Sequence, residues 1–516
     1  MGTDRGSGIV RRILTWPTGP KQGKGRRSMS TYPVAQQAAL RSENIPSKVA
    51  ARRGVWRDII LVLAVAAAVR VPCLIISCQD RARLFDNDSA SYLSLADELA
   101  AGHGFGRPVA LVPEGPKHWT PELFRTPGYP AVLAAGQWLT GDAVLAGIVL
   151  QNVLGLALCA GMVLVGRRIF GRPAGLLLGL LAAVDLQAVA LADHVLTDFP
   201  FAVLVFAAVV LAGRLLDRPS LAMAAALAGL LGAAAWVRPT GIGLPIVLGA
   251  CLLAAALKRK NVRLAMAAMA VAILGSGLIG AWIVRNGVVC GQYALTSVAR
   301  FNYVSIFGAH TLEYAEGIPH GVAVGRLCDR IGRGAREILH QPLSRQEDRL
   351  LHTVVNEVIE RYPGAFLWVS AKRMANLWFG PDKLILRTVG APEVGFGILR
   401  ASDGTPVPWS VWLLLGFSTL WLLGVYALVL RTLLLRLRGR HFAPLVWIAL
   451  VTAIYLLLVS SGPLGDPRMR APAVAPLLLA AAAGLSRRPS GRDEIGPATI
   501  QHPLIQMPLT SKTSGT

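Results

Sequence analysis

The fold is decided by stretches such as LADHVLTDFPFAVLVFAAVVLAGRLLD, residues 191–217. Asp193 and Asp198 come first, a long apolar run follows, and the first cation is Arg214. The run is apolar on every face of a helix, which is typical of a segment buried in a membrane. Its acids and its cation therefore mark opposite ends of one predicted span.

Runs of this kind fill most of the chain. Its 516 residues are 53% hydrophobic and only 16% charged, whereas a soluble protein has about a quarter charged residues. This composition excludes a disordered chain, and six cysteines are too few for a disulfide scaffold. We predict an all-α polytopic membrane protein with about ten transmembrane helices, each near the ~20 residues that a bilayer requires. The spans are expected at 57–78, 142–165, 174–191, 195–213, 220–237, 240–257, 263–284, 409–430, 443–460 and 471–486.

The cations stand in groups between the apolar runs. The 52 Lys and Arg residues outnumber the 29 Asp and Glu residues and give a net charge of +23. Groups such as Lys258–Arg259–Lys260 follow every second predicted span, and the short loops between hold few cations. Cytosolic loops have this distribution, so it argues against a nucleic-acid partner. Both termini are predicted to be cytosolic.

This topology places two long segments on the outer face, 79–141 and 285–408. We predict two disordered cytosolic tails, a basic one at 1–55 and a second at 487–516. Between them lie a transmembrane core at 56–284, which includes the catalytic outer loop 79–141, and C-terminal transmembrane helices at 409–486. A small outer-face domain is expected at 285–408, with an interfacial helix near 363–379.

The first outer segment contains two expected amphipathic helices. One follows Asp86-Asn87-Asp88-Ser89-Ala90-Ser91-Tyr92, and a Gly-His-Gly-Phe-Gly break at 102–106 ends it. The other begins at Arg125-Thr126-Pro127-Gly128-Tyr129-Pro130. Short helices that are apolar on one face lie in the membrane interface and do not cross the bilayer. We therefore expect both helices to be interfacial.

These motifs resemble those of the GT-C superfamily of membrane glycosyltransferases, in the branch that contains protein O-mannosyltransferases and bacterial aminoarabinose transferases. That branch has an acid–x3–Tyr motif and then a basic–Pro–aromatic motif after its first span, as 88–92 and 125–130 have here. Leu196-Thr197-Asp198-Phe199-Pro200 resembles the second acidic site of the family. The resemblance covers about residues 56–486 and extends to the motifs at 236–239, 282–286 and 466–472.

The resemblance implies a glycosyltransferase that moves a hexose or pentose from a polyprenyl-phosphate donor to an acceptor hydroxyl on the outer face. Its partners would be the donor, membrane lipids and a glycan, lipid or protein acceptor, with no nucleic acid. It also implies a place in the bacterial inner (plasma) membrane. The reaction needs a carboxylate to take the acceptor proton, and it needs cations or a metal against the departing phosphate.

The acids of the outer edge are the catalytic candidates. Asp88 is the expected general base and Asp86 the reserve, with capping of the helix near Ser89 as the alternative role. Asp198, Asp193 and Tyr92 are candidates for an acceptor or second acidic site. Asp198 stands inside the run Val195–Val210, where a carboxylate is costly unless it has a partner.

The arginines of the outer edge are the phosphate-binding candidates, because a guanidinium can donate two hydrogen bonds to a phosphate. Arg125 is the first of them, and Arg285, Arg468 and Arg470 follow at outer span ends, where snorkelling toward headgroups is the alternative. In the family an acid precedes the basic–Pro motif, and here Phe124 stands in its place. The resemblance therefore gives only weak support for a metal site in this chain. No cofactor is assigned, and a divalent metal stays open.

Other protein classes make different predictions. A lipid-linked glycan transporter or flippase would have charges near span centres and two related halves, and a glycan polymerase would lack the paired helices after span one. Arg238 stands beside an apolar run and is expected to serve packing. The sequence has no metal-ligand spacing and no nucleotide-binding loop. Cys290 and Cys328 both lie outside, and their bonding is left open.

Overall fold

The computed structural model describes residues 48–110, 117–391 and 407–485. Most of the two predicted tails, 1–55 and 487–516, thus falls outside the described residues. The chain divides into two units, Met1–Gly54 and Val55–Thr516. The description below concerns the second unit.

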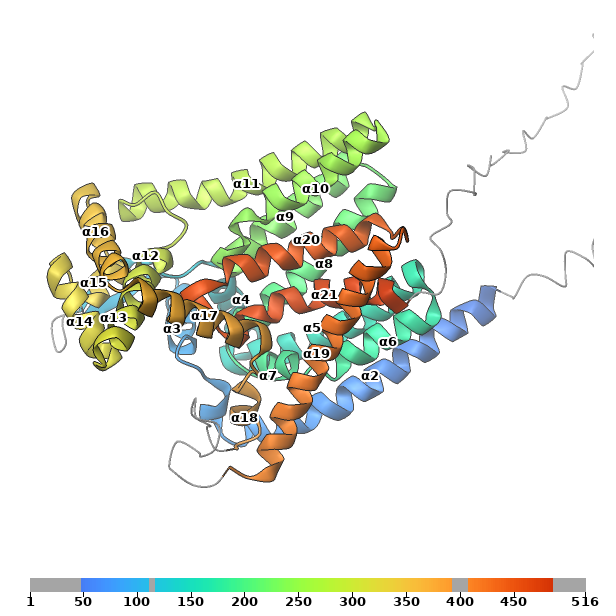
Figure 1. The fold of residues 1–516 in the computed structure, drawn as a ribbon, viewed down its shortest axis with the longest axis horizontal. Helices are drawn as coiled ribbons and strands as arrows, with labels where there is room; N and C mark the ends of the chain where they lie inside the picture. Colours follow the sequence, from blue (N-terminus) through green and yellow to red (C-terminus); the bar gives the residue numbers. More distant parts are fainter. Residues whose placement is uncertain (1–47, 111–116, 392–406, 486–516) are drawn as a thin grey trace, which may run out of the picture. The chain divides into compact units, whose positions relative to one another are not determined.

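Each predicted span is helical (Figure 1). Six helices are long and apolar enough to cross a membrane, and the pair α6–α7, bent by 53°, would make a seventh. The apolar helices α9, α20 and α21 are shorter, with 17, 16 and 15 residues, so ten crossings stay a prediction. The helices are α2 (Lys48–Cys78), α5 (Ala143–Phe170), α6 (Arg172–Ala183), α7 (Leu186–Ala192), α8 (Asp198–Asp217), α9 (Leu221–Val237), α10 (Leu244–Arg259), α11 (Val262–Cys290), α19 (Trp409–Leu437), α20 (Pro444–Val459) and α21 (Ala471–Leu485).

Short polar side chains begin several of these helices. The Asp142 carboxylate accepts hydrogen bonds from the N–H groups of Val144 and Leu145 at the start of α5. The Ser220 hydroxyl accepts from the N–H of Met223 at the start of α9. These contacts satisfy backbone donors that have no partner inside the helix. Local sequence thus fixes where these helices begin.

Helix α21 is the most deeply buried of the apolar helices. All its residues from Ala471 to Gly484 are buried, and it packs against α8, α19 and α20. Its many alanines allow the neighbouring backbones to approach closely. The sequence predicts α21 only as one more span, because an apolar run does not show how many other helices will surround it.

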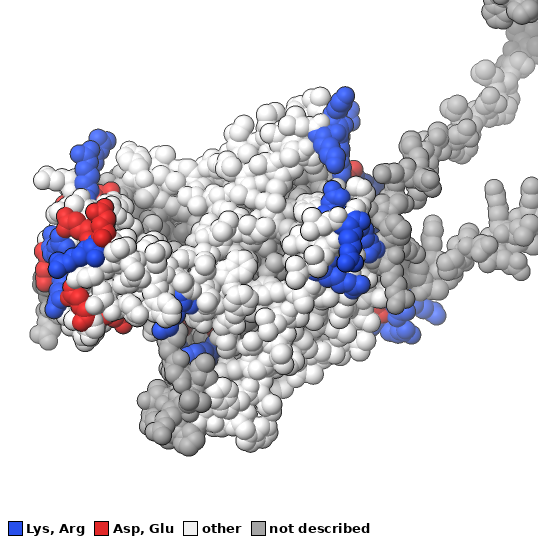
Figure 2. Space-filling model, in the orientation of Figure 1, with Lys and Arg blue, Asp and Glu red and all other residues white. Residues whose placement is uncertain are grey.

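Charged side chains gather at the two ends of these helices (Figure 2). At one end, Lys258, Arg259 and Lys260 are exposed around the turn between α10 and α11. At the other end, cations and acids are mixed over the helices of the second outer segment. The drawn face between the two ends is almost free of charge, as expected of a surface that meets lipid.

The first outer segment contains the two expected helices, α3 (Ser89–Ala100) and α4 (Gly128–Thr140). Between them lies an antiparallel hairpin of β1 (Gly106–Ala110) and β2 (Lys117–Pro121). The hairpin was not expected, because strands of five residues that contain Gly or Pro lack the alternation that marks a strand. The interfacial position of α3 and α4 stays a prediction.

The second outer segment has an apolar core of its own, in which Leu327, Leu351 and Val355 are buried. Helix α16 (Arg345–Arg361) begins with a capping box of Ser344 and Glu347. The helix expected near 363–379 is α17 (Pro363–Phe379). The remaining elements are α12 (Val298–Asn302), the π-helix η3 (Tyr303–Gly308), α13 (Ala309–Glu316), α14 (His320–Ile331), α15 (Ala335–His340) and α18 (Leu384–Thr388).

Candidate active site

Asp88 lies at the residue before α3, and its side chain makes no capping hydrogen bond to that helix. One carboxylate oxygen accepts from Nη2 of Arg125 at 2.7 Å, and the other accepts from Nη2 of Arg468 at 2.8 Å. The capping role considered from the sequence therefore does not describe Asp88. Its carboxylate is held between two guanidinium groups from distant parts of the chain.

Arg125 is fixed by contacts along its whole length. Its Nε donates to Oγ of Ser91 at 2.8 Å, and its Nη1 donates to the hydroxyl of Tyr92 at 3.2 Å. The guanidinium also lies over the rings of Tyr92 and Phe124. Before it, the Glu122 carboxylate accepts from the N–H groups of residues 124 and 125. The arginine side chain, 12% exposed, is thus presented in one orientation.

Arg468 is the centre of a group of charged side chains, named the charged cluster below, to which Asp86, Asp88, Asp198 and Arg125 also belong. It belongs to the short 3-10 helix η5 (Pro467–Arg470), which directly precedes α21. Its guanidinium contacts three carboxylates, those of Asp86 at 2.7 Å, Asp88 at 2.8 Å and Asp198 at 3.7 Å. The sequence placed Arg468 among the secondary candidates, and the structure joins it to all three acids.

Asp198 begins α8 and is 1% exposed. Its nearest cation is Nη1 of Arg238, at 2.9 Å, and Arg238 also donates to the hydroxyl of Thr197 at 3.1 Å. The same Thr197 hydroxyl lies 3.5 Å from that of Tyr92. Arg238, which the sequence assigned to packing, therefore takes part in the cluster as the partner of a buried acid.

Asp86 joins the second outer segment to the cluster. Besides Arg468, it accepts from Nη1 of Arg387 at 3.2 Å, and Arg387 belongs to α18. Sequence reasoning missed Arg387, because nothing near α18 resembles a motif. Helix α18 packs against α7 and against the 3-10 turn that precedes Asp86, and this packing brings the arginine to the site.

Three of the predicted site residues lie outside this cluster. Asp193 is fully buried and accepts from Nδ2 of Asn152 at 2.8 Å. Arg285 donates to the backbone carbonyls of residues 105 and 122. Arg470, 2% exposed, donates to the carbonyls of residues 377 and 380. These arginine contacts hold loops together, so Arg285 and Arg470 have structural partners in the fold. Their expected role in phosphate binding stays a prediction.

The charges around Asp88 determine its protonation. Burial by itself would raise the pKa of this carboxyl, but the guanidinium groups of Arg125 and Arg468 outweigh that effect and hold the pKa well below its ordinary range. Asp88 is therefore ionised at neutral pH and able to accept a proton. Its basicity is low for as long as both arginines remain on it.

The cluster suits an anion better than a metal ion. Asp86, Asp88 and Asp198 are each paired with at least one guanidinium, and a dication would be repelled by those arginines. Within the described parts of the chain, these acids do not form a group whose ligand atoms converge on one point. A phosphate, by contrast, is an anion like the carboxylates. It could replace them as the acceptor of the hydrogen bonds that the arginines donate.

An apolar cavity of about 150 Å³ lies close to the cluster. Helices α4, α5 and α8 line it, with Tyr129, Leu150 and Val203 among its walls. The Tyr129 ring packs edge to face on Tyr92, with 5.4 Å between ring centres, and Tyr92 accepts from Arg125. The cavity is thus separated from the guanidinium of Arg125 by one pair of aromatic rings.

Residues 124–280 match the family model described as dolichyl-phosphate-mannose-protein mannosyltransferase. The matched range contains Arg125, Asp198 and Arg238, three members of the charged cluster. The match covers less than half of the 516 residues, so it shows a similarity to this family over that segment. The resemblance to the GT-C branch with O-mannosyltransferases and aminoarabinose transferases, expected from the sequence, is confirmed there. No curated protein matches the chain.

Two solved GT-C structures are similar to the chain. One is the oligosaccharyltransferase AglB from Archaeoglobus fulgidus, in complex with an inhibitory peptide and a dolichol-phosphate: identity is 14%, 84% of this chain and 50% of that chain are covered, and the TM-score is 0.48. The other is ArnT from Cupriavidus metallidurans bound to undecaprenyl phosphate, with 16% identity, 83% and 76% covered, and a TM-score of 0.36. The chain thus spans about half the length of AglB.

Proposed function

We propose that this chain is a membrane glycosyltransferase that moves a sugar from a polyprenyl-phosphate donor to an acceptor hydroxyl on the outer face of the membrane. The observation that supports this most is the position of the Asp88 carboxylate between Arg125 and Arg468. This arrangement places a proton acceptor, the Asp88 carboxylate, in direct contact with two groups that can bind a phosphate, the guanidinium groups of Arg125 and Arg468. The match of residues 124–280 to a mannosyltransferase family model agrees with this chemistry.

The donor phosphate would bind to Arg125 and Arg468. Their side chains are 12% and 17% exposed, and Arg125 is held by Ser91 and Tyr92 whether or not it contacts Asp88. The donor phosphate is a diester and carries one negative charge, and a guanidinium forms charge-assisted, bidentate hydrogen bonds with a phosphate as it does with a carboxylate. We therefore expect the two arginines to turn from Asp88 to the phosphate when the donor binds.

This exchange would also activate Asp88. Its pKa rises when the two cations leave it for the phosphate, so the carboxylate becomes a better base. The acceptor oxygen then forms a bond to the anomeric carbon while the bond from that carbon to the phosphate oxygen breaks. The acceptor proton goes to Asp88, and the polyprenyl phosphate leaves with its charge on the arginines.

The donor's hydrocarbon tail would lie beside α4. The cavity lined by α4, α5 and α8 is apolar. Two residues of its wall, Val132 and Leu150, are 40% and 41% exposed. An apolar chain in that cavity would bring its phosphate toward Tyr92 and Arg125. The turn between α10 and α11, which carries Lys258–Arg259–Lys260, lies at the opposite end of the helices from α3, which follows Asp88 (Figure 1), and this supports an outer-face site.

The test is a transfer reaction with purified protein. The full chain in detergent is incubated with polyprenyl-phosphate sugars and with a cell extract that supplies glycan, lipid and protein acceptors, and release of the free polyprenyl phosphate is followed by mass spectrometry. Asp88→Asn, with its matched control Asp86→Asn, reports whether release depends on the proposed base. A transporter or flippase would leave the sugar–phosphate bond intact, so the absence of any released polyprenyl phosphate would refute the proposal.

The acceptor needs a separate measurement. Glycolipids, polysaccharides and glycoproteins of cells with and without this protein are compared by mass spectrometry. The class of molecule that loses a hexose or pentose identifies the acceptor. A polymerase using the same carriers would instead change the length of a glycan, which distinguishes that alternative.

A further inference from the structure

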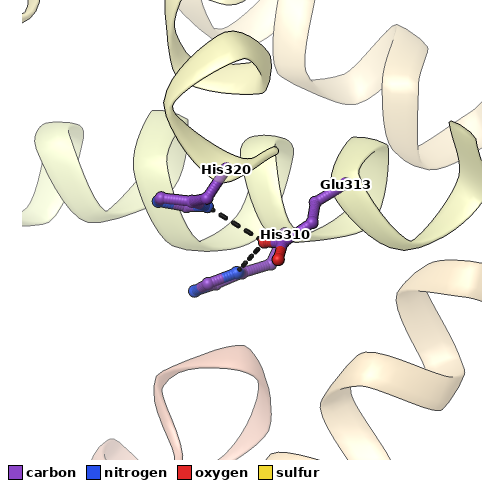
Figure 3. A group of neighbouring side chains, drawn as sticks. All are labelled: His310, Glu313 and His320. Carbon is purple, nitrogen blue, oxygen red and sulfur yellow. Dashed lines mark hydrogen bonds and ion pairs between the residues drawn. The ribbon is translucent and has the colours of Figure 1, made fainter. Parts of the chain in front are cut away.

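A second group of polar side chains lies in the second outer segment, apart from the cluster around Asp88. Nδ1 of His310 and Nδ1 of His320 both point to the same Glu313 carboxylate oxygen, at 2.8 and 3.1 Å (Figure 3). The two imidazole rings are stacked, with 4.3 Å between their centres. One ligand atom from each of the three residues lies within 4.8 Å of the other two.

Helix geometry and a tight turn bring the three residues together. His310 and Glu313 are three residues apart on α13, so they share one face of that helix. Helix α13 ends at Gly317, whose positive φ of 66° reverses the chain, and His320 begins α14 directly afterwards. The turn therefore folds the second histidine back over the first.

We infer that His310, Glu313 and His320 bind a divalent transition metal, with Zn²⁺ the best fit. Two imidazoles and one carboxylate are a common zinc donor set, which leaves a fourth position for water. Mg²⁺ and Ca²⁺ prefer oxygen ligands and would bind poorly here. The metal would replace the protons that the two Nδ1 atoms now direct to Glu313.

The outward nitrogens of the two rings have different neighbours. Nε2 of His320 lies 3.4 Å from Oγ of Ser305, and that hydroxyl can accept from the N–H that a metal-bound imidazole carries at Nε2. Nε2 of His310 lies 3.1 Å from Nη1 of Arg373 on α17. Arginine can only donate, so this contact requires a lone pair on Nε2 of His310.

Arg373 is therefore a competitor of the metal. Coordination through Nδ1 moves the His310 proton to Nε2, where it faces the Arg373 guanidinium, so the arginine has to turn away. Arg373→Gln removes the positive charge and supplies an amide oxygen that can accept from Nε2. We expect this variant to bind the metal at least threefold more tightly than the wild type.

The bound metal would join α13 to α14 inside the second outer segment. None of the three ligands contacts Asp86, Asp88 or Asp198. The inference is therefore independent of the proposed glycosyltransferase reaction, and its effect is expected on stability. A metal that binds only the folded protein raises its melting temperature as the metal concentration rises.

The test uses the full chain in detergent after treatment with a chelator. Zn²⁺ is titrated in competition with a chromogenic chelator, and thermal unfolding is recorded with and without Zn²⁺. We expect one Zn²⁺ per chain, a higher melting temperature, and a loss of affinity of more than tenfold in His310→Ala, Glu313→Gln and His320→Ala. Co²⁺ should give the visible absorption of a four-coordinate site, which remains a readout if one variant fails to fold.

His103→Ala is the matched control, because His103 and Glu98 form an exposed histidine–glutamate pair, at 2.8 Å, with no third ligand among the described residues. This variant should bind Zn²⁺ as the wild type does. Equal Zn²⁺ affinity in the wild type and in the His310 and His320 variants would overturn the inference. An unchanged affinity in Arg373→Gln would overturn the coordination through Nδ1 of His310.

Discussion

Asp88→Asn separates the chemical role of Asp88 from its structural one. Asparagine has the size of aspartate, and its Oδ1 can still accept one hydrogen bond, but its amide cannot accept from the second guanidinium. One charge-assisted hydrogen bond is lost, which costs about 1.5–3 kcal/mol. Arg468 keeps Asp86 at 2.7 Å, and Arg125 keeps Ser91 and Tyr92. The variant should therefore fold, with a modest fall in melting temperature.

Transfer should fall much further than stability. Loss of a general base typically lowers the rate by ~10²-fold or more, which corresponds to about 2.7 kcal/mol of activation free energy. The measurement is the release of polyprenyl phosphate under saturating donor, together with a thermal melt. Asp86→Asn is the matched control, since Asp86 contacts the same Arg468 at nearly the same distance but does not touch Arg125. Its melting temperature should fall similarly, with much smaller loss of transfer.

The pH dependence follows from the lowered pKa of Asp88. A carboxyl whose pKa is depressed in the folded protein stabilises it above the ordinary value of about 4, and that stabilisation is lost as the pH falls toward the folded pKa. In the free enzyme Asp88 is thus ionised throughout pH 5–8. We expect kcat/KM to show no acid limb from Asp88 in this range. Near-normal transfer in Asp88→Asn, or equal losses in the two variants, would refute the assignment of the base.

Three further outcomes are expected. Arg125→Ala should raise the apparent donor KM by about tenfold or more, through loss of one charge-assisted contact worth ~1.5–3 kcal/mol; initial rates against donor concentration measure it. Arg470→Leu should leave donor KM unchanged but lower the melting temperature, because each carbonyl left without a donor costs about 1–3 kcal/mol. A chain that starts near Arg52 should insert with the same orientation and keep its transfer activity, since every contact described for the site lies beyond residue 80; an accessibility assay on both membrane sides checks the insertion.

The sequence by itself determined the helices of this protein. Apolar residues on all faces of a helix specify a membrane-buried segment without any knowledge of its neighbours, so all ten expected runs are helical. Local signals also predicted α3 and α4, through the Gly-His-Gly-Phe-Gly break that ends the first and the Arg-Thr-Pro-Gly-Tyr-Pro motif that begins the second. Asp88, Tyr92 and Arg125 could be proposed as site residues because their motifs span only a few residues, and in the structure Arg125 contacts the other two.

Only the tertiary structure decided which arginines meet which acids. Arg468 is 380 residues from Asp88 and Arg387 is 301 residues from Asp86, and no local pattern encodes such pairs. These pairs form because α18 packs against α7, and because η5, which directly precedes α21, packs against α17. Arg470, two residues after Arg468, points instead to backbone carbonyls. Along the chain these two arginines look alike, and only the direction in which η5 turns each side chain separates the charged cluster from the packing around it.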